Sequence, residues 1–310
     1  MWKRLCWRRS DLLALVALVL ALVLGCSGPE TAENAENEPP TAEEPSARDP
    51  DVLRIALLPD EESSKVIEDN EGLKVYLEAK TGKPVELHVL PNYTAMIESV
   101  RNKHIDLAYF GPLSYCIAVD KDADVSAFAA KTKGGATTYT SVVIANTTAG
   151  IDNLTQIKGK RMGYGDPAST SSHLIPKGVL AAGGVAEGEY DESFLGKHDV
   201  VARSVESGNI DAGGLSRPIF DGLIENEKID SSKVKIIAES DPIPQYPWAV
   251  QNDLTDELKA SIKQAFLSLE DEAVLGPLKA EGFATILDSD YESIRHAAKI
   301  LGKDLTALQQ

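Results

Sequence analysis

The chain has 310 residues, of which 43% are hydrophobic, with 48 acidic and 31 basic residues and a formal net charge of −17. This composition excludes the basic surface by which proteins bind nucleic acid. An anionic ligand would need a short-range, desolvated pocket, because so acidic a surface offers no long-range attraction. The length is sufficient for two folded lobes.

Residues 1–25 have the layout of a secretory signal peptide. Four basic residues between positions 3 and 9 precede an apolar segment over 12–24, which is short for a membrane span. The segment ends in Val23-Leu24-Gly25-Cys26, which resembles the bacterial lipobox. We therefore expect cleavage before Cys26 and lipid on that cysteine, and the alternative is a signal anchor that stays uncleaved.

The residues that follow the signal predict a tether and then a folded part. Residues 26–50 contain Glu, Pro, Ala and Asn with almost no large apolar side chain, so they cannot bury enough surface to offset the entropy of ordering. We expect a disordered tether that holds the protein at the outer face of the membrane. Cys116 is then the only cysteine of the folded part, and its apolar surroundings over 113–119 predict a buried, inert thiol.

From residue 52 onward, short β-rich runs alternate with helical stretches. The predicted strands are 52–58, 85–89, 105–110, 126–131, 141–145, 161–164, one near Phe194, 210–213 and 234–239. The predicted helices are 65–80, 93–103, 113–119, 169–182, 199–207, 218–226, 256–275 and 291–301. This rhythm predicts an α/β fold of parallel sheets covered by helices.

The number of predicted strands favours two α/β lobes over one very wide sheet. We place the chain crossings near 131–139 and 239–247. Lobe 1 would then consist of residues 51–135 plus 245–310, and lobe 2 of residues 136–244. Two crossings make a hinge, and ligands of such folds bind in the cleft between the lobes.

Four consecutive hydroxyl residues, Ser169-Thr170-Ser171-Ser172, stand between the strand 161–164 and the apolar part of the helix 169–182. A single Ser or Thr would suffice to cap the helix. Four in a row bring side-chain hydroxyls together with the unpaired N–H groups of the first helical turn, which favours a site for a tetrahedral oxyanion.

Other chemistries have weaker support in the sequence. Residues 163–168 fit the dinucleotide pattern G-x-G-x-x-A, but Pro167 and the position in the middle of the chain speak against a nucleotide site. There is no G-x-S-x-G elbow of a serine hydrolase. The five histidines show no close metal-ligand spacing, so we expect neither a metal nor a cofactor.

Several short motifs together resemble the substrate-binding proteins of phosphonate and phosphite ABC importers. They are Thr81-Gly82-Lys83-Pro84-Val85, Asn92-Tyr93, the segment 105–112 (IDLAYFGP), the segment 166–176 and the segment 208–213 (GNIDAG). The resemblance implies a type II periplasmic-binding-protein fold that closes on its ligand. It also implies a monomeric, non-enzymatic protein that delivers a small phosphorus oxyanion to a membrane permease and its separate ATPase.

The resemblance also implies a set of ligand contacts. The hydroxyls at 169–171 would bind the phosphoryl oxygens, together with Tyr93 and His198. The aromatic residue before Gly111 is often tyrosine in the family. Here it is Phe110, which supplies shape but no hydrogen bond. Tyr246 and Trp248 would wall the pocket. The predicted ligand-binding residues are Tyr93, Phe110, Gly111, Ser169, Thr170, Ser171, His198 and Tyr246.

The same comparison bears on the choice of ligand. Members that bind aminoalkylphosphonates pair the amine with acidic residues, whereas the corresponding segments here, 216–218 and 245–248, carry no carboxylate. Because a buried ammonium without a carboxylate is costly, we expect phosphite or a small alkylphosphonate, with hypophosphite and phosphate also open. The alternatives are a ligand-sensing partner of a membrane receptor, or an enzyme on the same fold of the thiamine-precursor synthase type.

Overall fold

The computed structural model describes residues 47–305. The predicted signal peptide, the lipidation of Cys26 and most of the predicted tether lie outside these residues. Over 47–305, no helix combines the length and the apolar character needed to cross a membrane. Arg48 is already part of the fold, because its guanidinium pairs with Asp106 and Asp253. The fold therefore includes Arg48, which precedes the expected start at 51.

The strands are β1 (Leu53–Leu57), β2 (Val85–Val89), β3 (Leu107–Tyr109), β4 (Val125–Thr132), β5 (Thr138–Tyr139), β6 (Ser141–Asn146), β7 (Arg161–Tyr164), β8 (Asp191–Phe194), β9 (Ala212–Ser216), β10 (Val234–Glu239), β11 (Ile243–Pro244), β12 (Pro247–Gln251) and β13 (Gly282–Thr285). The helices are α1 (Ser63–Thr81), α2 (Tyr93–Arg101), α3 (Pro112–Asp120), α4 (Ile175–Ala182), α5 (His198–Glu206), α6 (Arg217–Glu225), α7 (Asp256–Leu267), α8 (Glu272–Leu275) and α9 (Glu292–Ile300). The short turns are η1 (Leu154–Ile157), η2 (Thr170–Leu174) and η3 (Asp288–Tyr291).

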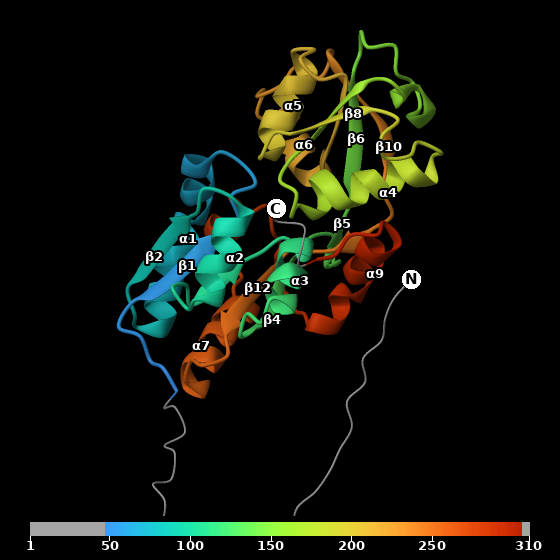
Figure 1. The fold of residues 1–310 in the computed structure, drawn as a ribbon. Helices are drawn as coiled ribbons and strands as arrows, with labels where there is room; N and C mark the ends of the chain where they lie inside the picture. The colour runs from blue at the N-terminus through green and yellow to red at the C-terminus, as the bar shows by residue number, and fades with distance from the viewer. Residues whose placement is uncertain (1–46, 306–310) are drawn as a thin grey trace, which may run out of the picture. The chain divides into compact units, whose positions relative to one another are not determined.

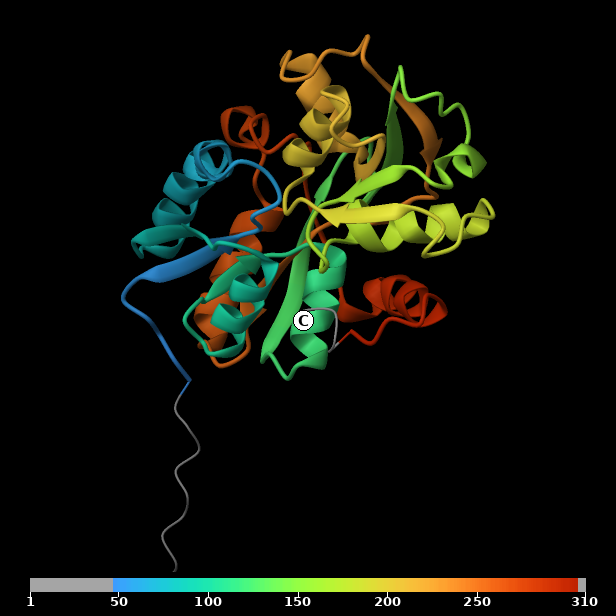
Figure 2. The ribbon, with the colours of Figure 1, turned by 45° about the horizontal axis from the view of Figure 1, so that its top comes forward.

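Two sheets organise the molecule. The first has the order β13-β4-β12-β3-β1-β2 and the second the order β10-β6-β9-β7-β8, while β5 and β11 form a two-stranded ribbon. Figures 1 and 2 show each sheet with its own helices, the first lobe with α1, α2 and α7 and the second with α4, α5 and α6. The chain passes between the sheets twice, after β4 and after β10. The lobe boundaries at 135 and 245 stay a prediction.

The expectation of parallel sheets is wrong for part of each sheet. Strands β1, β2 and β3 are parallel, as are β7, β8 and β9. Strand β12 runs antiparallel to β3 and β4, and β6 runs antiparallel to β9 and β10. The reason lies in the crossings, because β4 carries the chain out of the first sheet and β12 brings it back in the opposite direction.

Two predicted helices also differ from the structure. The helix expected over 256–275 is divided into α7 and α8, because the side chain of Asp271 caps a new helix by accepting a hydrogen bond from the amide of Ala273 at 2.9 Å. The helix expected from Ser169 begins with a π-helical turn, η2, and continues as α4. Strands β5, β11, β12 and β13 were not expected, since they are short and follow no clear alternation.

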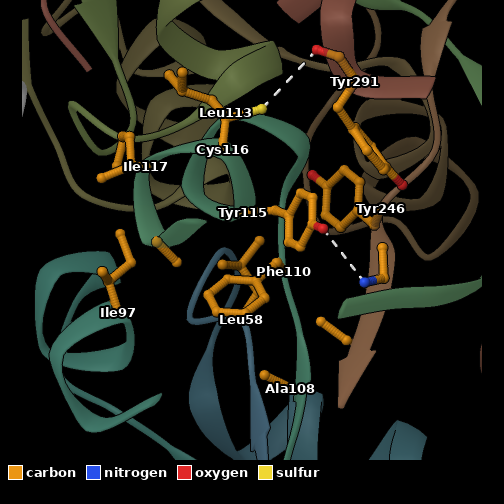
Figure 3. Packing of buried hydrophobic residues seen from close by; sticks show 14 of the residues in the cluster. Leu58, Ile97, Ala108, Phe110, Leu113, Tyr115, Cys116, Ile117, Tyr246 and Tyr291 are labelled. Carbon is orange, nitrogen blue, oxygen red and sulfur yellow. Dashed lines mark hydrogen bonds between the residues drawn. The ribbon is translucent and has the colours of Figure 1, made fainter. Parts of the chain in front are cut away.

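The core of the first lobe packs beneath α3. Figure 3 shows Phe110, Tyr115, Cys116 and Tyr291 in this cluster, with the Tyr115 hydroxyl accepting a hydrogen bond from the Ala127 amide. Burial raises the pKa of the Cys116 thiol to about 12, so the thiolate does not form near neutral pH. The buried position predicted for this cysteine is confirmed.

Candidate functional site

The hydroxyl run lies at the N-terminal end of η2 and is buried throughout. Ser169 caps this turn by accepting a hydrogen bond from the amide of Ser172 at 3.2 Å. The first amides of a helix have no acceptor within it, so the segment presents donors from both backbone and side chains. The sequence-based expectation of a helix start at this run is met, although the turn is π-helical.

Ser172 has a structural role at the end of the run. Its hydroxyl donates to the carbonyl of Gly214 and accepts from the amide of Gly165, the latter at 2.8 Å. A Cβ at Gly165 would lie 2.8 Å from the Ser172 hydroxyl oxygen, so only glycine allows this approach. Ser172 therefore anchors the run to the second sheet and uses its hydroxyl in doing so.

Thr170 connects the run to the opposite lobe. Its Oγ1 accepts a hydrogen bond of 2.7 Å from the amide of Leu113, in the first turn of α3. Gly111 lies next to this contact: a Cβ there would make an ordinary contact of 3.8 Å with Thr170 Oγ1 and a tight one of 3.3 Å with Leu58. The structure therefore brings Gly111 and Thr170 together, from two different sheets.

Two buried hydroxyls near this junction have no hydrogen-bond partner within 3.5 Å. Over the described residues, neither the Oγ of Ser171 nor the Oη of Tyr139 has such a partner, although the two hydroxyls lie near each other. Burial raises the pKa of Tyr139, and contacts of its hydroxyl with Ser171 and Tyr246 oppose that rise, which places the three side chains next to one another. Leaving a buried hydroxyl unpaired costs about 1–3 kcal/mol, so both are available to donate to a ligand.

His198 is fully buried and lies at hydrogen-bond distance from Ser169. Its Nδ1 accepts a hydrogen bond of 3.0 Å from the amide of Ser216, so the proton of the neutral ring is on Nε2. That nitrogen lies 3.3 Å from the Oγ of Ser169. Burial lowers the pKa of His198 to about 3, so the ring is neutral at physiological pH and acts through Ser169.

This arrangement orients the hydroxyl of Ser169. Its oxygen already accepts from the amide of Ser172 and from the imidazole of His198. A hydroxyl has one proton to donate, and that of Ser169 is thereby directed away from both neighbours. Tyr93, the first residue of α2, also contacts Ser169 and is buried at 1% exposure, so these two predicted residues come together.

Phe110 is buried in the core of the first lobe. Its ring lies in the core beside Leu58, 6.2 Å from the ring of Tyr115 (Figure 3), and it does not line the adjoining cavity. Tyr109 lines that cavity instead. Side chains alternate along a strand, so if one of these two neighbours faces the ligand, the other faces the core.

A cavity of about 120 Å³ is lined by Tyr139, whose hydroxyl lies near Thr170 and Ser171, but no residue of the hydroxyl run lines it. Its walls include Asp60, Tyr109, Lys131, Tyr139, Ser216, Tyr246 and Trp248. Aromatic rings pack closely around it, with Tyr109 stacked on Trp248 at 4.9 Å and Tyr139 edge-on to Tyr246 at 5.2 Å. Of the predicted ligand-binding residues, Tyr246 lines this cavity and the other seven do not, so the ligand-binding set stays a prediction.

Sequence reasoning missed several polar residues of the cavity, among them Asp60, Lys131 and Tyr139. Asp60 follows β1 at the carboxyl end of a parallel strand, where ligands of α/β folds bind, and Lys131 is the one charge in the otherwise uncharged β4. These two positions could have indicated from the sequence that Asp60 and Lys131 belong to the site. The segments 216–218 and 245–248 carry no carboxylate, as stated above, but Asp60 reaches the cavity from a segment that was not considered.

The neutral, buried state of His198 has a measurable effect on stability. Its folded pKa of about 3 lies below its ordinary value of 6.5, so the unfolded chain takes up a proton first as pH falls. The stability due to this residue is present above pH 6.5 and is lost as pH falls toward about 3. We expect His198→Asn to lose less unfolding free energy between pH 7 and pH 5 than the unaltered protein does.

Urea denaturation at the two pH values measures this difference. His104→Asn, at an exposed position, serves as the matched control and should follow the unaltered protein. Equal losses for His198→Asn and His104→Asn would contradict the assignment of a neutral imidazole.

The chain was compared with known proteins. A family model described as "ABC transporter, phosphonate, periplasmic substrate-binding protein" matches residues 55–291. The chain is 30% identical to the phosphate-import protein PhnD of Mycolicibacterium smegmatis over 93% of this chain and 95% of that protein. It is 29% identical to the phosphonates-binding periplasmic protein of Escherichia coli, over 72% of this chain and 68% of that protein.

Solved structures give the same result for the fold. PhnD1 of Prochlorococcus marinus, in complex with methylphosphonate, superposes with a TM-score of 0.77 at 23% identity and covers 83% of this chain and 100% of that one. A binding protein component of an ABC phosphonate transporter from Pseudomonas aeruginosa has a TM-score of 0.76 at 26% identity, over 82% of this chain and 87% of that one. The fold is therefore that of the type II periplasmic binding proteins, and the chain belongs to the periplasmic substrate-binding proteins of phosphonate ABC transporters.

Proposed function

We propose that this substrate-binding protein captures a small phosphorus oxyanion without an amine and holds it between the hydroxyl run and the tyrosines of the opposite wall. The direct donors are the hydroxyls of Ser169, Thr170, Ser171 and Tyr139, with His198 orienting Ser169. The two lobes close on the anion, and the closed form is presented to the permease of the importer. The protein is extracytoplasmic and carries out no catalysis.

The observation that carries this proposal is the pair of buried, unpartnered hydroxyls at Ser171 and Tyr139. In a folded protein nearly all buried polar groups are hydrogen-bonded, and each unpaired one costs free energy. An oxyanion between them would accept from both. A hydrogen bond to a charged acceptor contributes about 1.5–3 kcal/mol, so a few such donors supply substantial affinity without a positively charged residue.

The choice of ligand is supported by the shared chemistry of the relatives. Their names refer to phosphate import, phosphonates and phosphite, and one structure contains methylphosphonate. All of these ligands carry a tetrahedral phosphorus with several oxygens. The aromatic-walled cavity has room for a hydrogen, hydroxyl or methyl substituent, and its lysines Lys131, Lys133 and Lys279 offset the carboxylates of Asp60, Glu61 and Asp69 with which an ammonium would pair. Phosphate, phosphite and methylphosphonate are therefore the favoured ligands, and hypophosphite offers fewer oxygens.

We also propose that the protein acts as a monomer anchored by lipid on Cys26. The lipobox-like sequence at 23–26 supports this anchoring. The mass of the N-terminal peptide of the mature protein tests it, and an unmodified Cys26 or an intact residue 1–25 segment would contradict it.

Calorimetric titration of the purified protein with phosphate, phosphite, methylphosphonate and hypophosphite tests the proposed ligand class. We expect binding of at least one of the first three and weaker binding of hypophosphite, because a donor left without an acceptor penalises the ligand with fewer oxygens. Binding of none of the four would overturn the proposal. Tight binding of 2-aminoethylphosphonate alone would overturn the amine-free assignment.

A further inference from the structure

Three helices at the lobe junction begin with an amide that donates to the opposite lobe. The amide of Tyr93, the first residue of α2, donates to the carboxyl of Asp166 at 3.4 Å. Helix α3 makes the contact with Thr170 described above, and the amide of His198, first in α5, donates to the carbonyl of Asp60 at 2.9 Å. The first amides of a helix have no acceptor within it. Closing the lobes therefore also completes the capping of these three helices.

Asp166 is the charged acceptor among the three. It follows β7, is buried at 8% exposure and lies three residues before the hydroxyl run. Its two carboxylate oxygens serve different lobes, because Oδ1 accepts from the amide of Ala168 at 2.8 Å and Oδ2 accepts from the amide of Tyr93. Its backbone carbonyl accepts from the amide of Ser169 at 2.9 Å. The residue thus shapes the turn that leads into the run and reaches across to α2.

The carboxylate of Asp166 has no positively charged neighbour. Burial raises its pKa, and the amides of Ala168 and Tyr93 oppose that rise. Over residues 47–305, it forms no ion pair with a lysine, arginine or histidine. The N-terminal end of a helix favours a negative charge, and here that end is α2. Burial, and then the charges of Asp60 and Asp166, raise the pKa of Tyr93, which keeps its hydroxyl protonated beside Ser169.

A carboxylate without a counter-ion is unfavourable next to an anion. Two negative charges repel, and more strongly where water is excluded. We propose that Asp166 is a positioning residue, which holds α2 against the hydroxyl run in the closed form and so slows release of the anion through Tyr93 and Ser169 rather than by contact. This inference rests on the proposed function and adds a residue that acts on the closure of the lobes.

Asparagine at position 166 separates the cross-lobe bond from the local turn. Its single oxygen is sufficient for the adjacent amide of Ala168, while its NH₂ group would face the amide of Tyr93, which leaves two donors without an acceptor. Asp166→Asn therefore removes both the cross-lobe bond and the negative charge. The first loss weakens anion binding and the second strengthens it, so the sign of the change decides which effect is larger.

The experiment is calorimetric titration and stopped-flow kinetics with inorganic phosphate or phosphite, whichever binds the unaltered protein more tightly. We expect Asp166→Asn to bind about five- to tenfold more weakly, mainly through faster dissociation, because the cross-lobe bond forms only once the lobes have closed. Asp166→Glu keeps the charge, but its longer side chain is displaced from both amides and should also weaken binding. Asp191→Asn, at an exposed position in β8, makes the same change in net charge and should bind like the unaltered protein.

Hydrogen exchange of the Tyr93 amide tests the contact without any substitution. An amide at the start of a helix exchanges rapidly when it lacks an acceptor. In the unaltered protein, saturating anion should slow its exchange by at least about tenfold, and in Asp166→Asn most of this slowing should be lost. The measurement on the unaltered protein decides the matter even if the variants do not fold.

The outcomes separate this inference from the proposed function. If the unaltered protein binds none of the phosphorus oxyanions, the proposed function fails. If it binds one of them, but Asp166→Asn binds it equally well or more tightly, the role of Asp166 is overturned and the proposed function stands. The same holds if the Tyr93 amide exchanges at one rate with and without the anion. A lower melting temperature of ligand-free Asp166→Asn with an unchanged dissociation rate would show a role in the local turn alone and would also overturn the inference.

Discussion

Replacing Ser171 with alanine is expected to weaken anion binding by about 10- to 100-fold while the thermal stability of the ligand-free protein stays unchanged or rises slightly. The reason is that the Ser171 hydroxyl has no partner among the described residues, so its removal costs the free protein nothing. The bound state loses one hydrogen bond to a charged acceptor, which contributes about 1.5–3 kcal/mol. Calorimetric titration with phosphate or phosphite, together with a thermal melt, measures both effects.

Ser172→Ala is the matched control for this prediction. That hydroxyl is committed to Gly165 and Gly214 within the second lobe, so its loss leaves a buried amide and a buried carbonyl unpaired. We expect Ser172→Ala to lower the melting temperature of the ligand-free protein clearly, whereas Ser171→Ala should leave it unchanged or raise it slightly. A loss of stability in Ser171→Ala with unchanged affinity would show that the hydroxyl is structural after all.

Thr170→Val is expected to weaken binding by at least about tenfold and to speed ligand release. The Thr170 hydroxyl accepts from the amide of Leu113 across the two lobes at 2.7 Å and keeps its own proton for a ligand oxygen. Valine keeps the branched shape but removes both bonds, and it leaves the Leu113 amide buried without an acceptor. Titration calorimetry and stopped-flow measurement of ligand dissociation report the two effects.

Thr170→Ser retains the hydroxyl and should restore most of the affinity. If Thr170→Val binds the anion as tightly as the unaltered protein, Thr170 contributes neither to the ligand nor to the closed arrangement. If serine fails to restore binding, the γ-methyl packing of Thr170 rather than its hydrogen bonding is what matters.

The order of strands and helices was largely predictable from the sequence because both depend on local periodicity. Strand direction could not be predicted, since it depends on how the chain crosses between sheets. Strand β12 was not predicted, yet it lies between β3 and β4 and completes the first sheet. Likewise the break between α7 and α8 depends on one capping side chain, Asp271.

The candidate site shows the same division between local and tertiary information. The hydroxyl run was recognisable because its residues are adjacent in the sequence. Asp60, Lys131 and Tyr139 were missed because they come from three separate connections and strands and meet only in the folded chain. Tyr109 and Phe110 could be told apart only by the direction of their side chains, which depends on how β3 is seated in the sheet.

The neutral hydroxyl cradle explains how an acidic protein can bind an anion. The long-range field of the chain is repulsive, so the attraction must come from donors that water cannot reach. Among the residues that line the cavity, Lys131 adds a positive charge, and burial lowers its pKa to about 8. The site would thus discriminate by hydrogen-bond pattern rather than by net charge.

A crystal structure of the protein with bound phosphite or phosphate tests the central claim most directly. The account predicts the phosphorus between the hydroxyl run and the tyrosine wall, with anion oxygens within about 3 Å of the hydroxyls of Ser169, Thr170, Ser171 and Tyr139. An anion seated elsewhere, with the hydroxyl of Ser171 turned away from it, would contradict the account.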